Sequence, residues 1–91
     1  MYQIVFHNSF KKDLKRLEKR NIDRNLLNNV LTLFVEKGNV SEIYKPHKLS
    51  GDYSGFWECH VKSDWLLIYE IDEQKKMVIL VRTGTHSDLF K

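Results

Sequence analysis

Residues 56–82 read FWECHVKSDWLLIYEIDEQKKMVILVR, and this stretch decides the fold. It contains three segments rich in β-branched and aromatic residues: Phe56–Lys62, Trp65–Ile71 and Met77–Arg82. The two connections between them are short and polar, and strands joined in this way pair antiparallel with their neighbours. The stretch therefore predicts a three-stranded antiparallel meander.

The N-terminal half predicts one strand and two helices. Tyr2–Phe6 is apolar enough for a strand, and Asn8 or Ser9 can cap the helix that follows. The apolar face of that helix is formed, at helical spacing, by Phe10, Leu14 and Leu17. Asn21 or Asp23 can cap a second helix that ends near Gly38. Its apolar stripe consists of Ile22, Leu26, Leu27, Val30, Leu31 and Phe34.

A stripe this wide must be covered, so we expect both helices to pack on one face of the sheet. A polar loop containing Pro46, Gly51 and Gly55 connects the second helix to the meander. The predicted fold class is α+β, with the order β-α-α-β-β-β. It consists of a small antiparallel sheet, made of the N-terminal strand and the C-terminal meander, and ends in a short turn or helix.

Length and composition set further limits. With 91 residues, of which 42% are hydrophobic, the chain is expected to form one compact domain over residues 1–91. The single cysteine, Cys59, cannot form an internal disulfide, and the sequence contains neither an export leader nor a long apolar run. We therefore expect a cytoplasmic protein that does not enter a membrane.

The first helix is strongly basic on its polar face. Asp13 and Glu18 are its acidic residues. The basic ones are Lys11, Lys12, Lys15, Arg16, Lys19 and Arg20. Such a cluster predicts contact with a polyanion, although a lysine-rich face can also be simply solvated.

The C-terminal half gathers side chains suited to RNA cleavage, namely His47, His60, Asp64, Arg82 and His86. Histidine can accept or donate a proton near neutral pH, and arginine can hold a phosphate with parallel hydrogen bonds. Side-chain alternation is expected to place His60 and Arg82 together on the face away from the helices. The apolar sets expected beneath the helices are Trp57, Cys59 and Val61, and Met77, Ile79 and Val81.

Three motifs carry a resemblance to a known family. They are KPHKLSG at 45–51, WECHVKSDWLLIY at 57–69 and RTGTHSDLF at 82–90. Together they resemble the YafQ branch of the RelE superfamily, whose members are ribosome-dependent mRNA endonuclease toxins of type II toxin–antitoxin pairs. That resemblance implies a small α+β sheet with helices on one face, which agrees with the predicted order of elements.

The resemblance also implies roles for individual residues. The positions that match the catalytic set of the family are His47, His60, Asp64, Arg82 and His86. His86 would be the general acid at the 5′-oxygen, and either Asp64 or one of the other two histidines would be the base. Arg82 would hold the scissile phosphate. Accessory positions near the substrate match Trp65 and Phe90, and Phe90 would stack on a base or wedge against it.

The implied function is cleavage of mRNA in the ribosomal A site by attack of the 2′-hydroxyl. The partners would be ribosome-bound mRNA, ribosomal RNA and a cognate antitoxin, with operator DNA reached only through the antitoxin complex. The basic helix would supply further substrate contacts through Lys11, Lys12, Lys15, Arg16 and Lys19. No metal or cofactor is expected, because His60, Asp64 and His86 lack metal-ligand spacing and an arginine lies among them.

Other interpretations remain open. Asp64 has the composition of a turn residue, Trp65 can belong to the core, and Phe90 can be a hydrophobic latch. His7 has no charged companion nearby in the sequence and is left out of the site. A toxin of the same fold that binds a protein target such as gyrase, as ParE relatives are thought to do, is one alternative function. A non-catalytic nucleic-acid-binding module is the other.

Overall fold

The computed structural model describes residues 1–90 of the chain. Its helices and strands, in chain order, are β1 (Gln3–Phe6), α1 (Asn8–Glu18), α2 (Arg24–Lys37), β2 (His47–Lys48), β3 (Trp57–Lys62), β4 (Trp65–Asp72), β5 (Met77–Gly84) and α3 (His86–Leu89). Two short 3₁₀ turns, η1 (Glu42–Tyr44) and η2 (Gly51–Tyr53), flank β2. The predicted α+β class and the order of its elements are confirmed, and β2 is an addition to them.

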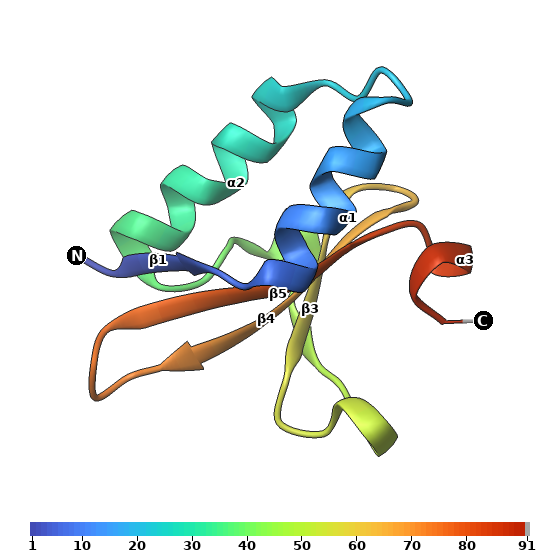
Figure 1. Cartoon of the computed structure of the whole chain (residues 1–91). Coiled ribbons are helices and arrows are strands. Elements are labelled where there is room, and N and C mark those ends of the chain that lie inside the picture. The colour runs from blue at the N-terminus through green and yellow to red at the C-terminus, as the bar shows by residue number, and fades with distance from the viewer. Residues whose placement is uncertain (91) are drawn as a thin grey trace.

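The sheet has the strand order β1-β5-β4-β3-β2 (Figure 1). Strands β3, β4 and β5 pair antiparallel, which confirms the predicted meander. At one edge, β1 pairs parallel with β5 and so differs from the antiparallel arrangement expected for it. Parallel neighbours need a long connection, and the chain between β1 and β5 contains both long helices.

The N-terminal cap of α1 is His7. Its side chain accepts a hydrogen bond from the backbone N–H of Ser9 at 3.3 Å. The prediction of Asn8 or Ser9 as the cap is therefore wrong by one or two residues, a common error at helix boundaries. Ser9 instead donates its hydroxyl to the carbonyl oxygen of Val81 at 2.5 Å, which joins the start of α1 to β5.

The two ends of α2 follow the sequence prediction. Asp23 accepts a hydrogen bond from the backbone N–H of Asn25 at 2.9 Å and caps the N-terminus. Gly38 ends the helix with a φ of 76°, and a Cβ at this position would lie 2.3 Å from the Tyr2 ring. Glycine is thus required by both conformation and space. Within residues 1–90, neither α2 nor any other helix is long and apolar enough to cross a membrane.

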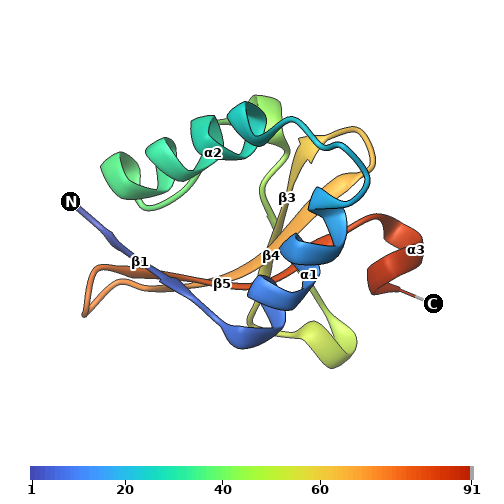
Figure 2. The ribbon, with the colours of Figure 1, turned by 45° about the horizontal axis from the view of Figure 1, so that its top comes forward.

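The two faces of the sheet are covered differently. Both long helices lie on one face, above the strands in Figure 1, and Figure 2 shows the molecule with this upper side turned toward the viewer. The core beneath them includes the fully buried Phe34 and Tyr69 and the nearly buried Phe10. The opposite face, called the open face below, is covered only in part. Its small apolar cluster of Leu66, Ile68 and Leu89 is flanked by Leu49, Tyr53 and Phe56.

Side-chain alternation in β5 differs from the prediction. We expected Met77, Ile79 and Val81 to face the helices, but Val78 and Leu80 are the fully buried members of this strand's core. That prediction is wrong because both alternating sets are apolar through position 81, so the pattern does not identify the buried one.

A β-bulge then restores the predicted position of Arg82. Tyr69 pairs with Leu80, whereas Ile68 pairs with Arg82, so Val81 is an extra residue in β5. An extra residue shifts the alternation by one position. Arg82 consequently shares the open face with its cross-strand partner Ile68.

Beyond the end of β1, helix α1 covers the edge of β5. The last β1 pair is Phe6 with Leu80. From there the Ser9 hydroxyl contacts Val81, and the carboxylate of Asp13 accepts the backbone N–H of Thr83 at 3.1 Å. The sheet-facing side of α1, where Asp13 is buried with Phe10 and Leu17, is therefore attached directly to the segment of β5 that carries Arg82.

Candidate active site

Three histidines from three different elements lie side by side at the open face. The ring centroids of His47, in β2, and His60, in β3, are 6.4 Å apart. His86 begins α3, and its ring centroid is 6.1 Å from that of His60. The structure therefore brings together the three histidines that the sequence analysis selected, with His60 in the middle.

Asp64 holds His86 in one orientation. The carboxylate, in the turn between β3 and β4, accepts the backbone N–H of His86 at 3.0 Å and contacts its ring Nδ1 at 2.8 Å. These hydrogen bonds, the backbone one first, lower the pKa of Asp64. Because a carboxylate accepts, Nδ1 carries the proton in this pair. Nε2 of the exposed His86 ring is left available for chemistry.

Glu58 is a site residue that the sequence analysis missed. Its side chain is 6% exposed, and its Oε1 lies 3.3 Å from Nε2 of His47 and 3.9 Å from Nε2 of His60. It pairs directly with His47 across the strands and precedes His60 by two positions on the same face of β3. That spacing was a usable signal, because residues two apart in a strand share a face.

The other ring nitrogen of each of these histidines faces a backbone carbonyl. Nδ1 of His47 lies 2.9 Å from the oxygen of Lys45, and Nδ1 of His60 lies 3.4 Å from that of Ser63. Both nitrogens of His47 are thus close to acceptors. The corresponding contacts of His60 are longer at both nitrogens, so this ring is held less tightly.

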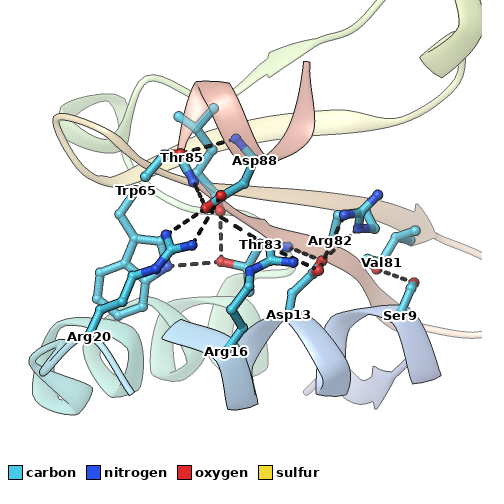
Figure 3. A network of polar contacts seen from close by, with 11 residues as sticks. Ser9, Asp13, Arg16, Arg20, Trp65, Val81, Arg82, Thr83, Thr85 and Asp88 are labelled. Atoms are coloured by element: carbon cyan, nitrogen blue, oxygen red, sulfur yellow. Dashed lines mark hydrogen bonds and ion pairs between the residues drawn. The ribbon is translucent and has the colours of Figure 1, made fainter. Parts of the chain in front are cut away.

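Arg82 lies in the same cross-strand row as Glu58, with Ile68 between them. Strand spacing separates the two by about 10 Å. Its guanidinium is bound by Asp13 of α1, with Nε at 2.6 Å from Oδ2 and Nη2 at 3.2 Å from Oδ1 (Figure 3). The hydrogen bond to Asp13 is the main cause of a raised Arg82 pKa, and Tyr53 makes a smaller contribution.

The structure favours the core alternative for Trp65. The side chain is buried against the helices, and its indole N–H donates to the hydroxyl of Thr83 at 2.9 Å. Little of the ring is left for a substrate to contact. Its place directly after Asp64 shows that it instead anchors the turn that presents this carboxylate.

Phe90 lies at the C-terminal end of the open face. Its side chain is half-exposed, and its ring centroid is 6.3 Å from that of His86 and 5.7 Å from that of Tyr53. The contact with Tyr53 is edge-to-face. Phe90 therefore both holds the chain end against η2 and leaves part of its ring open beside His86.

The basic residues of α1 and of the turn that follows it divide into two groups. The lysines are exposed, at positions Lys11, Lys12, Lys15 and Lys19. The arginines form ion pairs within the fold, Arg16 with Asp13 at 3.3 Å and Arg20 with Asp88 at 2.9 Å. Asp13 lies in α1 itself, whereas the Arg20 pair, together with a longer contact of 3.9 Å from Arg16 to Asp88, links this region to the C-terminal part of the chain. The lysines form the unpaired part of this basic surface.

The side chains as placed do not fit a metal ion. Within residues 1–90, no three His, Cys, Asp or Glu side chains are arranged so that they could coordinate one.

Comparison with protein families gives a match over almost the whole chain. The model described as "Bacterial toxin of type II toxin-antitoxin system, YafQ" matches residues 2–91. The "mRNA interferase toxin YafQ" of Escherichia coli strain K12 is 36% identical to this chain over 88 residues, covering 96% of this chain and 94% of the relative.

Solved structures show the same arrangement of elements. In a DinJ-YafQ complex from E. coli, the matching chain is 35% identical and superposes with a TM-score of 0.87, covering 100% of both chains. A metal-bound toxin from Helicobacter pylori is 41% identical and superposes with a TM-score of 0.88, covering 99% of this chain and 100% of the other. Sequence and fold thus indicate the same group of proteins.

Proposed function

Because the chain belongs to the YafQ family of bacterial type II toxin–antitoxin toxins, we propose that it is a ribosome-dependent endoribonuclease. It cleaves mRNA in the ribosomal A site and thereby inhibits translation and growth. The observation that carries this proposal is the exposed pair of His86 and Asp64 beside two further histidines. Together these groups supply the two proton transfers that RNA cleavage requires.

His86 is the general acid. In the reaction, the 2′-oxygen forms a bond to phosphorus, the bond to the 5′-oxygen breaks, and that oxygen takes a proton from Nε2 of His86. The products are a 2′,3′-cyclic phosphate and a 5′-hydroxyl. Asp64 binds Nδ1–H and stabilises the charged ring before the transfer. Its lowered pKa makes this carboxylate a weak proton acceptor, so it orients His86 and is not the base.

His60 is the general base that accepts the proton of the 2′-hydroxyl. It is the neighbour of His86, so the two rings can lie on opposite sides of one phosphate. Its contacts with backbone and carboxylate are longer than those of His47, which leaves a nitrogen of His60 easier to expose. Glu58 stabilises the positive charge that His60 gains, and the same carboxylate also contacts His47.

Cationic side chains hold the RNA. Arg82 binds the scissile phosphate with the N–H groups that Asp13 does not occupy. The exposed lysines of α1 and its C-terminal cap, Lys11, Lys12, Lys15 and Lys19, contact phosphates of mRNA or ribosomal RNA. Phe90 stacks on a base with the open part of its ring.

Dependence on the ribosome follows from the openness of the site. The side chains of His47 and His86 are 48% and 58% exposed, so no deep cleft holds a flexible RNA chain here. Effective catalysis needs the reacting groups to be aligned. The ribosome supplies this alignment by presenting the codon in a fixed conformation, and free RNA is a poor substrate.

A cognate antitoxin is the expected protein partner. The E. coli relative was solved in a complex named DinJ-YafQ. By analogy, an antitoxin with an acidic segment that folds on binding covers the basic surface of this chain and neutralises it. Contact with operator DNA occurs only through this complex.

Two other functions explain the residues of the site less well. A toxin that binds a protein target such as gyrase, or a non-catalytic nucleic-acid-binding module, needs neither a carboxylate–histidine pair nor a second histidine beside it. Both alternatives predict that replacing His86 leaves the phenotype unchanged. The pair of Asp64 and His86 therefore favours the enzyme.

The experiment that tests this function is a cleavage assay on one defined mRNA, with and without programmed ribosomes. Wild-type protein and His86→Ala are compared, each with and without EDTA. We expect cuts within A-site codons that need the ribosome, persist in EDTA and disappear in the variant. The EDTA arm is decisive for metal independence, because the H. pylori relative was solved with bound metal. Absence of cleavage by wild type in every condition would refute the proposed endoribonuclease activity.

A further inference from the structure

Asp13 is a buried carboxylate on a helix whose other ionisable residues are mostly basic. It is 4% exposed. Both oxygens are occupied, since Oδ2 accepts from Nε of Arg82 at 2.6 Å and from the backbone N–H of Thr83 at 3.1 Å. Oδ1 accepts from Nη2 of Arg82 at 3.2 Å and from Nη2 of Arg16 at 3.3 Å. Figure 3 shows these groups converging on Asp13.

We propose that Asp13 is a positioning residue that fixes the guanidinium of Arg82 for the scissile phosphate. This inference rests on the proposed function, because it concerns the residue that holds the phosphate there. Two of the five N–H groups of the Arg82 guanidinium are bound by Asp13, so the substrate can be reached only by the part of the group that this carboxylate does not occupy. Two bonds to one carboxylate fix both the plane and the direction of that fork.

Asp13 fixes the backbone as well as the side chain. Thr83, which donates its N–H to Asp13, directly follows Arg82 in β5. The edge of β5 is not paired with β1 at this point, so the carboxylate replaces a strand partner. Asp13 thus holds both the guanidinium of Arg82 and the peptide N–H that follows this residue. Electrostatic stabilisation of a phosphate requires such preorganisation.

The charge balance of this cluster is compatible with phosphate binding. A carboxylate beside Arg82 would by itself offset the positive charge offered to RNA. Arg16 shares the same carboxylate, so the three groups together keep one net positive charge. The side chain of Arg82 is 29% exposed, so its remaining donors are accessible.

A double-mutant cycle tests the proposal. The proteins are wild type, D13N, R82A and D13N/R82A, with Glu18→Gln as a control because this acid lies on the same helix and pairs with Arg24 at the surface. Single-turnover cleavage on programmed ribosomes gives the maximal rate and the toxin concentration at half-saturation. We expect D13N to lower the rate about 10- to 100-fold, with little change in half-saturation. In the R82A background, D13N should have no further effect, and Glu18→Gln should match wild type.

The outcomes separate this proposal from the proposed function. Wild type that fails to cleave refutes the function itself. Wild type that cleaves while D13N cleaves equally fast overturns the role of Asp13, as does an equal effect of D13N with and without Arg82. Circular dichroism checks that the variants fold. Should D13N unfold, the rate of hydrogen exchange at Nε–H of Arg82 in the wild-type protein tests the role of Asp13 instead. Slower exchange than at the surface residue Arg24 supports the proposal, and equal exchange overturns it.

Discussion

At the residue scale, the chemistry of each histidine depends on what its two ring nitrogens contact. His86 has one nitrogen bound to Asp64 and the other available, whereas both nitrogens of His47 face acceptors. Three residues of the same type therefore have three different environments. The roles proposed for His86 as acid and His60 as base follow from these contacts and not from the residue type.

The first prediction at this scale concerns Asp64. Its pKa is lowered by His86, so it stays ionised and keeps the ring oriented throughout the neutral range. We expect Asp64→Asn to reduce the single-turnover rate about 10-fold or more, because an amide can favour the wrong ring tautomer. His86→Ala should reduce it by about 100-fold or more. Equal activity of Asp64→Asn and wild type on programmed ribosomes would contradict the orienting role.

The second prediction concerns Glu58. Glu58→Gln keeps the shape of the side chain but removes the charge beside His47 and His60. We expect the cleavage rate to fall about tenfold, the effect of losing one charged hydrogen bond. Glu70→Gln is the matched control, because Glu70 is exposed on β4 and should behave as wild type. Two variants with the same rate would show that Glu58 has no part in the site.

At the scale of elements, α3 depends on contacts outside itself. A helix of four residues cannot be stable alone. Thr85 and Asp88 cap it reciprocally, Leu89 is buried on the open face, and Arg20, in the turn after α1, binds Asp88 at 2.9 Å. The element that carries His86 is therefore held in place by two contacts, the ion pair of Asp88 with Arg20 and the burial of Leu89 in the small apolar cluster.

A pH-dependent stability follows from this arrangement. The hydrogen bond from Arg20 is the main cause of an Asp88 pKa far below its usual range. A carboxylate with a lowered folded pKa stabilises the fold above its unfolded pKa of about 3.9, and this contribution is lost as pH falls toward the folded pKa. We expect Asp88→Ala to lower the free energy of unfolding by about 1–2 kcal/mol near neutral pH. At acidic pH, the difference in the free energy of unfolding between Asp88→Ala and wild type should become smaller.

Denaturant unfolding of both proteins at about pH 7 and about pH 2 measures this difference. Glu36→Gln is a suitable control, since Glu36 is an exposed acid near the end of α2. A loss of stability that is the same at both pH values would mean that the charge of Asp88 has no role. In that case the effect would come from the cap alone.

Local patterns predicted the elements well, because caps, apolar stripes and strand composition are properties of neighbouring residues. Asp23 and Gly38 bound α2 as expected. Non-local features were missed for a physical reason. The parallel pairing of β1 and the bulge at Val81 depend on partners far along the chain, and β2 has only two residues, too few to show a period.

The same distinction holds for the site. The sequence selected the histidines and Asp64, which the structure brings together. It did not select Asp13, which lies 69 positions before Arg82 and looks like one acid in a basic helix. The role of such a residue depends on its partner in space, and the spacing of residues in the sequence does not reveal that partner.

At the scale of the whole molecule, the site depends on an intact core beneath β3. Cys59 immediately precedes His60 and is fully buried under the helices. Burial raises the pKa of this thiol to about 12. We expect the native protein to resist alkylation near neutral pH, because the thiolate is the reactive form. Denatured protein should react rapidly. Fast labelling of the native protein would show that this region opens without global unfolding.

The measurement that tests the central claim most directly uses an mRNA with a single 2′-deoxynucleotide at the mapped cleavage position. Programmed ribosomes present this RNA and an all-ribose control to the same toxin. We expect the control to yield a 2′,3′-cyclic phosphate and a 5′-hydroxyl, and the substituted RNA to remain uncut at that position. Cleavage at the deoxy-substituted position at the same rate would contradict attack by the 2′-hydroxyl, with His60 as the base and His86 as the acid.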